Sequence, residues 1–157
     1  MSDANRQRRL FAAATGLWLG GLSWLSGCSS TKVAQKPAPA NKFPVSTARS
    51  EHEYRADVAR HLYQRNTDRI YQGKLPPLLY AIGVTRLSIS PTGEVLDIDW
   101  MRKPSHAPEV VAEIERTIRA AAPLPVARAV QPLMYTDTWL WHKSGRFQLD
   151  TLTEGQT

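Results

Sequence analysis

Cysteine is nearly absent from this chain of 157 residues, which has a single one, Cys28. One thiol excludes an internal disulfide framework, a thiol redox pair and a Cys-based zinc cluster, so the fold must be held by burial of apolar side chains. Acidic residues are also fewer than basic ones, 14 against 20, which gives a formal charge of +6. With 42% hydrophobic residues, the length fits one small domain with tails and excludes two large domains.

The first 27 residues have the layout of an export signal. Arginines in the first ten residues precede an uncharged run, residues 10–27, as in the charged and apolar regions of such signals. The run ends in Leu25, Ser26, Gly27 and Cys28, which resembles the lipobox of bacterial lipoproteins. The resemblance implies that Cys28 is the lipid attachment site and that residues 1–27 are a lipoprotein signal peptide. The alternative is an uncleaved membrane anchor, because about 18 residues is the lower limit for a spanning helix.

Two neighbouring features bear on the destination of the chain. In Gram-negative lipoproteins an Asp after the acylated Cys tends to retain the protein at the inner membrane, so the resemblance, with Ser29 in that place, implies the outer membrane. The segment from Arg8 to Phe11 is similar to a twin-arginine export motif, although no cofactor site calls for folded export, and we favour the general secretory route.

Export changes the meaning of the basic charge. Loss of residues 1–27 lowers the formal charge from +6 to about +4. A periplasm-facing protein meets little nucleic acid, so we predict no nucleic-acid partner. The excess charge more plausibly faces anionic lipid, peptidoglycan or acidic protein surfaces.

Residues 28–49 have no periodic apolar pattern and contain three prolines, which predicts a flexible tether. Ser50 and Glu53 then have the spacing of a capping box, and the pattern predicts a helix to about Gln72, where Gly73 ends it. Residues 153–157 are predicted to be a disordered tail.

Alternating apolar residues predict a hairpin of two strands between residues 80 and 100, joined by a tight turn at Pro91 and Gly93. Pro108 opens a second predicted helix that runs to about Ala122. A β-prone run, Thr138 to His142, forms the predicted final strand, with Phe147 and Leu149 closing it. Residues 50–152 are thus predicted to be an α+β domain of α-β-β-α-β order, in two layers, with a three-stranded antiparallel sheet and both helices on one face.

The order and spacing of these motifs resemble the TonB and TolA C-terminal domain family. The similarity lies in the hairpin with its Pro-x-Gly turn, in the alanine-rich helix that closes on Pro123 and Pro125, and in the terminal Phe147-Gln148-Leu149. Members of that family bind envelope proteins in the periplasm, in part by adding a strand to a sheet edge. The resemblance implies a protein-binding module, an adaptor or accessory subunit of an envelope complex whose partner the sequence does not name.

The predicted interface is the final strand, taken as an edge. Its residues are Thr138, Trp139, Leu140, Trp141 and His142, with the two tryptophans as anchors or, equally, as core. The short tether and the lipobox depart from the family's transducers, so we do not expect motor coupling, although an inner-membrane TonB-type transducer stays an alternative.

A second alternative is a structural lipoprotein that contacts peptidoglycan or anionic lipid through the first helix. That helix presents a basic surface of four arginines at Arg55, Arg60, Arg65 and Arg69. A solvated basic face is the default interpretation of such a pattern.

The sequence gives no pattern for catalysis, a cofactor or a metal. His52 and His61 lie nine positions apart, half a turn out of phase on a helix, and so cannot share an ion. Asp97 and Asp99 alternate with apolar residues, which predicts a solvated strand face rather than a catalytic pair. We therefore predict a protein that is not an enzyme.

Overall fold

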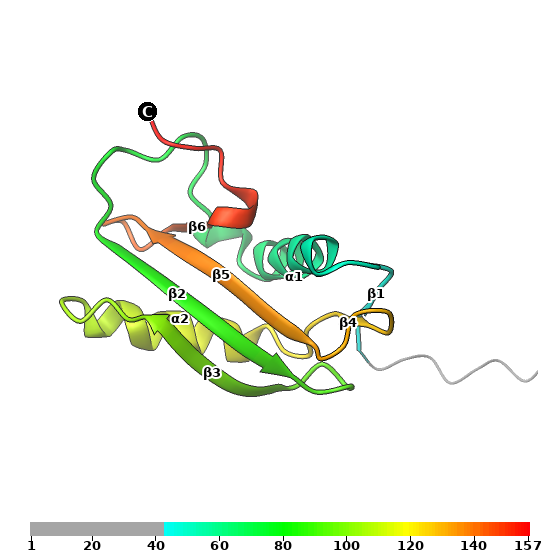
Figure 1. The fold of residues 1–157 in the computed structure, drawn as a ribbon. Coiled ribbons are helices and arrows are strands. Elements are labelled where there is room, and N and C mark those ends of the chain that lie inside the picture. Colours follow the sequence, from blue (N-terminus) through cyan, green and yellow to red (C-terminus); the bar gives the residue numbers. More distant parts are fainter. Residues whose placement is uncertain (1–42) are drawn as a thin grey trace, which may run out of the picture. The chain divides into compact units, whose positions relative to one another are not determined.

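A computed structural model of the chain describes residues 43–157 (Figure 1). The signal peptide, Cys28 and most of the predicted tether lie outside these residues. The described elements are, in order, β1 (Val45–Ser46), α1 (Glu51–Arg65), η1 (Thr67–Arg69), β2 (Ala81–Ile89), β3 (Val95–Arg102), α2 (Pro108–Ala120), β4 (Val126–Ala127), β5 (Met134–Trp141), β6 (Phe147–Leu149) and η2 (Asp150–Leu152). The fold is mixed α+β. No helix between residues 43 and 157 has the length and apolarity needed to cross a membrane.

The main sheet has four antiparallel strands in the order β3-β2-β5-β6, so the predicted three-strand count is wrong. The additional strand is β6, which follows a tight reversal after β5. Gly145 has a φ of +80° there and donates its N–H to the carbonyl of His142 at 3.0 Å. Glycine adopts this backbone conformation without the steric cost that a Cβ would add. The chain can therefore return beside β5, where Phe147 pairs with Trp141.

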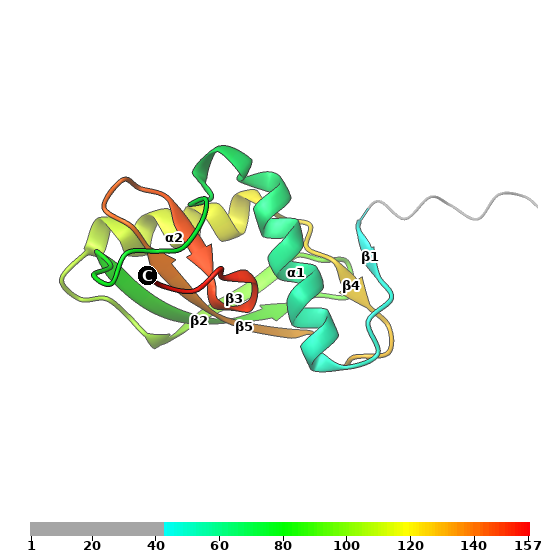
Figure 2. The same ribbon diagram turned by 90° about the horizontal axis from the view of Figure 1, so that it is seen from above.

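Both helices cover one face of this sheet, as predicted (Figure 2). Along β2 and β5 buried residues alternate with half-buried ones, because successive side chains of a strand point to opposite faces. Leu87, Tyr135 and Trp139 point toward the helices and join Val58 and Ile114 in one core. Among the described residues, these side chains form one hydrophobic core between the helices and the sheet.

Helix α1 begins where the sequence predicts and ends earlier. The Ser50 hydroxyl accepts a hydrogen bond from the Glu53 N–H at 3.2 Å, which caps the helix. The predicted end at Gln72 is wrong, because Asn66 leaves the helical conformation with a φ of −138°. Its side chain donates to the Leu62 carbonyl at 2.9 Å and so satisfies a terminal carbonyl of the helix.

The β2–β3 hairpin forms as predicted, and its turn is tightly packed. Gly93 has a φ of +86°, and a Cβ at this position would lie 2.4 Å from the carbonyl oxygen of Leu124. The Leu124 N–H donates to the Gly93 carbonyl at 2.7 Å. The turn is thereby bound to the segment that leads from α2 into β4, and no side chain fits between them.

Both ends of the described chain belong to the fold. Val45 and Ser46, which we assigned to the tether, form β1 and pair in parallel with β4. The Ser46 hydroxyl also donates to the Asp57 carboxylate on α1 at 2.5 Å. In place of a disordered tail, Gln156 pairs with Leu75. The folded unit is therefore longer at both ends than the predicted 50–152.

Candidate functional site

The predicted interface strand does not lie at an edge. β5 pairs with β2 along its whole length on one side and with β6 through residues 139–141 on the other. The N–H of Thr138, beyond the end of β6, donates to the Asp137 carboxylate at 2.8 Å. The expectation that residues 138–142 form an edge is wrong, because the turn at residues 143–146 brings β6 alongside them. The outer side of β6 is also partly covered. Ile70 forms a β-bridge with Phe147, and the Tyr71 N–H donates to the Phe147 carbonyl at 3.0 Å.

The two tryptophans of β5 are core residues rather than exposed anchors. Trp139 is fully buried and donates its indole N–H to the Thr85 hydroxyl at 3.0 Å. Trp141 is 4% exposed and stacks on Phe147 with ring centroids 5.5 Å apart. Leu140 and Thr138 lie on the opposite face, and they and His142 are half-buried. Trp139 and Trp141, which were predicted as either anchors or core, therefore belong to the core of the domain.

Most of the predicted basic surface is engaged in ion pairs. Arg55 contacts the Asp137 carboxylate at 3.0 Å, and Arg60 pairs with Asp57 three positions before it on α1. Arg69 lies on η1 rather than on α1, because the helix ends at residue 65, and its guanidinium contacts Glu113 at 3.2 Å. Arg65 is exposed. The four arginines do not form one free basic face of a helix.

Asp137 is the centre of a buried polar cluster. Its side chain is fully buried and accepts hydrogen bonds from the Arg55 guanidinium at 3.0 Å, the Tyr135 hydroxyl at 2.7 Å, the Thr138 N–H at 2.8 Å and the Thr151 N–H at 3.3 Å. Burial raises the pKa of Tyr135 well above its ordinary value, and the Asp137 charge acts in the same direction. These hydrogen bonds connect α1, β5 and η2, so the cluster stabilises the packing of the three elements.

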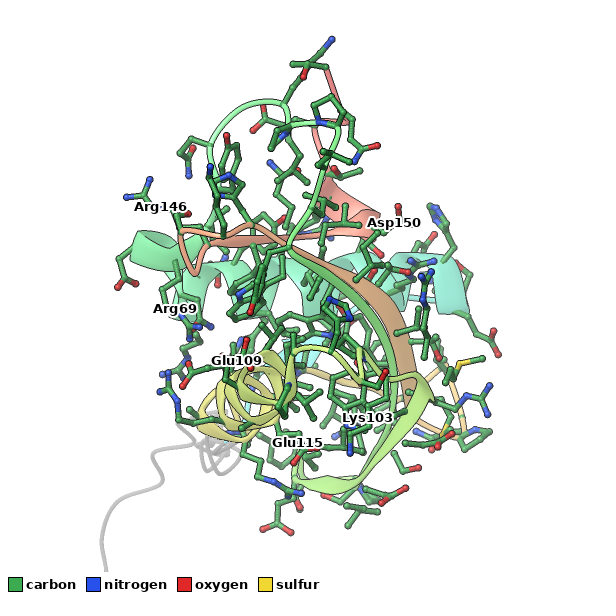
Figure 3. The ribbon with its side chains drawn as sticks, turned by 90° about the vertical axis from the view of Figure 1, so that its left-hand side faces the viewer. Arg69, Lys103, Glu109, Glu115, Arg146 and Asp150 are labelled. Carbon is green, nitrogen blue, oxygen red and sulfur yellow. The ribbon has the colours of Figure 1, made fainter. Side chains whose placement is uncertain are left out.

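A groove of about 590 Å³ lies at the end of the molecule that holds the start of α2. Figure 3 shows two of its lining side chains, Arg69 and Glu109, on the same side of the domain. The Tyr80 hydroxyl donates to Glu109 at 2.6 Å, a hydrogen bond that lowers the pKa of Glu109 and raises that of Tyr80. Glu113 is held by Arg116, chiefly, and by Arg69, which together lower its pKa. Because these groups satisfy one another, the groove presents few free polar contacts for a ligand.

The open edge of the sheet is β3, which forms its lower margin in Figure 1. β3 pairs with β2 on one side, and no described strand pairs with its other side. Two of its side chains are unusually exposed for apolar residues, Leu96 at 64% and Met101 at 53%. Unpaired backbone groups and exposed apolar side chains along one strand are the features on which another strand can be added.

The backbone direction along this edge follows from the hydrogen bonds of β2. The Ile89 N–H donates to the carbonyl of Leu133, the residue just before β5, at 3.0 Å. The Ser90 N–H donates to the Glu94 carbonyl, on the side of β3, at 2.9 Å. Because backbone groups of successive residues point to alternate sides of a strand, the even-numbered residues of β2 bond β3.

The same alternation continues in β3. Its residues Asp97 and Asp99 are opposite Ser88 and Arg86, so their backbone groups point inward. The N–H and C=O groups of Ile98, between them, and of Trp100, after Asp99, therefore point outward, into solvent.

Neither the Asp137 cluster nor the open edge at β3 was predicted from the sequence. Asp137 lies two positions from each of the buried aromatic residues Tyr135 and Trp139, so the alternation of β5 places it on the same, helix-facing side, although its partners come from distant segments. The sequence pattern did not predict that β3 is the open edge of the sheet, because the strand order depends on where β6 packs. Cys28 lies outside the described residues. Within residues 43–157, no three His, Asp or Glu side chains are placed to hold a metal ion.

Comparisons with protein-family models, with curated proteins and with solved structures gave no match to this chain.

Proposed function

We propose that this chain is a lipid-anchored, periplasm-facing protein-binding module, an adaptor or accessory subunit of an envelope complex, that acts through the edge strand β3. The observation that carries the proposal is the open side of β3, with the outward backbone groups of Ile98 and Trp100 and the exposed Leu96 and Met101. The TonB- and TolA-like order of motifs supports a binding role, and the lipobox at residues 25–28 supports the anchor.

Strand addition at β3 is energetically reasonable. An incoming extended segment would satisfy backbone groups that now face water, and its side chains would cover apolar surface on β3. The competing hypothesis of a basic helix that contacts peptidoglycan or lipid is less well supported, because three of its four arginines already pair with carboxylates. A TonB-type transducer has no observation in its favour among the described residues.

The test is site-specific photo-crosslinking in cells. A photoreactive amino acid at Leu96 or Met101 should capture one discrete envelope protein. The control is Leu78, which is 89% exposed but lies outside every strand of the sheet, and it should capture none. Capture from Leu78 equal to that from β3, or no capture from β3, would contradict the proposal.

A further inference from the structure

The charges along β3 favour one kind of partner strand. We infer that the edge accepts an extended segment in which basic and apolar residues alternate. This inference rests on the proposed function and adds the chemistry of the partner. The argument depends on which side chains flank the added strand, and on which pairings the edge disfavours.

Two carboxylates line the helix-free face of this edge. Asp97 and Asp99 are both exposed and point to the face that the helices leave open, as do their partners Ser88 and Arg86 on β2. Arg86 approaches Asp99 only to 4.0 Å, and Asp97 has no ion pair among the described residues. A strand added beside β3 would place its own open-face residues next to these two carboxylates, where Lys or Arg is favourable.

The other face of the edge is apolar. Ile98 and Trp100 point toward the helices, are partly buried and pack against the core. The Trp100 indole donates to the Glu115 carboxylate on α2 at 2.9 Å, so the ring is held in place. Figure 3 shows Glu115, on α2, and Lys103, which follows β3, at this margin of the sheet. The partner residues that face Ile98 and Trp100 would bury apolar surface, which favours Val, Ile or Leu at alternate positions.

A second copy of this chain does not fit the edge well. Outward groups can pair with outward groups in two antiparallel registers that cover most of β3. One centres on Ile98 and places Asp97 opposite Asp99 of the second copy, twice. The other centres on Asp99 and places the two Asp99 side chains opposite each other. A register centred on Trp100 covers only residues 98–102. Like charges directly opposite are destabilising, so the aspartates disfavour self-pairing and favour a basic strand.

The geometry of β3 restricts the partner further. The register between β2 and β3 shifts at both ends of β3, next to Leu96 and next to Met101. Such irregularities interrupt a ladder, as charged side chains on an edge also do. The regular stretch is therefore short, from Asp97 to Trp100. Arg102 and Lys103 follow it, so basic partner residues are favoured beside the aspartates and disfavoured past Met101.

The test uses the chain from residue 29 onward, without the predicted signal peptide and Cys28, and two capped peptides. One alternates Lys with Val, and the other alternates Glu with Val. At about 1 mM peptide, NMR should show amide shifts confined to β3 with the Lys–Val peptide. Binding of the Glu–Val peptide should be weaker by up to about 25-fold, because each of the two charge pairs changes the affinity by up to about fivefold.

Charge reversal gives the sharper arm. The variant Asp97→Lys/Asp99→Lys should prefer the Glu–Val peptide, whereas the control Asp68→Lys, at an exposed site on η1, should keep the original preference. Equal binding of both peptides, shifts away from β3, self-association, or no binding at all would overturn the inference. Capture of an envelope protein from Leu96 in cells would still support the proposed function in that case, so the two failures are distinguishable.

Discussion

Replacement of Asp137 by Asn should destabilise the domain strongly, although the substitution is conservative in shape. The substitution keeps the shape of the side chain but removes its charge and half of its acceptor capacity. Four donors converge on this carboxylate, and two of them are backbone N–H groups that cannot move away. Removal of one partner of a buried ion pair costs about 3–5 kcal/mol. Because the Arg55 side chain is 39% exposed and water can solvate it, we expect the lower end, about 3 kcal/mol.

The partner substitution should cost less. In Arg55→Met the fully buried Asp137 carboxylate loses its counter-charge but keeps three of its four hydrogen bonds, and these donors continue to stabilise the charge. We expect a loss of about 1–2 kcal/mol, because a hydrogen bond to a charged group contributes about 1.5–3 kcal/mol and solvent exposure reduces this one. Tyr135→Phe, which removes one donor, should cost about 1 kcal/mol. This asymmetry between carboxylate and guanidinium is the signature of a buried acceptor with several donors.

Urea unfolding followed by tryptophan fluorescence measures these differences. The dependence of the unfolding free energy on urea should stay the same in all three variants, since the buried area is unchanged. A domain of this size has about 5–15 kcal/mol of stability, so a loss of about 3 kcal/mol is easily resolved. A loss below about 1 kcal/mol for Asp137→Asn, or a larger loss for Arg55→Met, would refute the reasoning. The connection between α1, β5 and η2 would then depend on apolar contacts alone.

Three further predictions concern other parts of the chain. Gly93→Ala should lower the free energy of unfolding by about 2–3 kcal/mol, because it combines a positive φ with a Cβ clash. The control Gly155→Ala, with a φ of +85° and open space around it, should lower it by only about 1 kcal/mol. Equal losses of the two variants in thermal melts would contradict the role of the turn. The contribution of Tyr135 to the free energy of unfolding should be complete below about pH 10 and decrease as the pH rises above it, because burial raises the pKa of Tyr135 and the unfolded chain ionises it first. Tyr135→Phe should reduce this decrease in urea titrations over a series of pH values. Cys28→Ser should abolish labelling by palmitate, and a wild-type chain without label would contradict the lipobox interpretation.

Local signals predicted the start of α1, the turn of the β2–β3 hairpin and the start of α2. Ser50 with Glu53, the Pro91–Gly93 turn and Pro108 each act through bonds to near neighbours in sequence, so their patterns identify α1, the hairpin and α2. The early end of α1 was missed because Asn66 competes with the helix through its own side chain, a local effect that the spacing of apolar residues does not reveal.

Strand order was the part that the sequence left undetermined. β3 and β5 are both β-prone, and each could have been an edge. The choice depends on β6, a strand of three residues that has almost no periodicity to detect. The burial of Trp139 and Trp141 follows from the same packing, since β6 brings Phe147 against both rings. The candidate interface therefore moved from β5 to β3 for a tertiary reason.

The pairing of β1 with β4 determines how the domain responds to tension. Any pull on the chain from its amino-terminal side is applied first to a pair of two-residue strands, supported by the hydrogen bond between Ser46 and Asp57. Because this pairing covers only two residues, whereas the four-stranded sheet is paired over many more, we expect β1 to detach before the sheet opens. Release of residues 43–50 would lengthen the connection by about 25 Å at roughly 3.3 Å per residue. The first segment of the fold is therefore expected to detach under tension before the main sheet does.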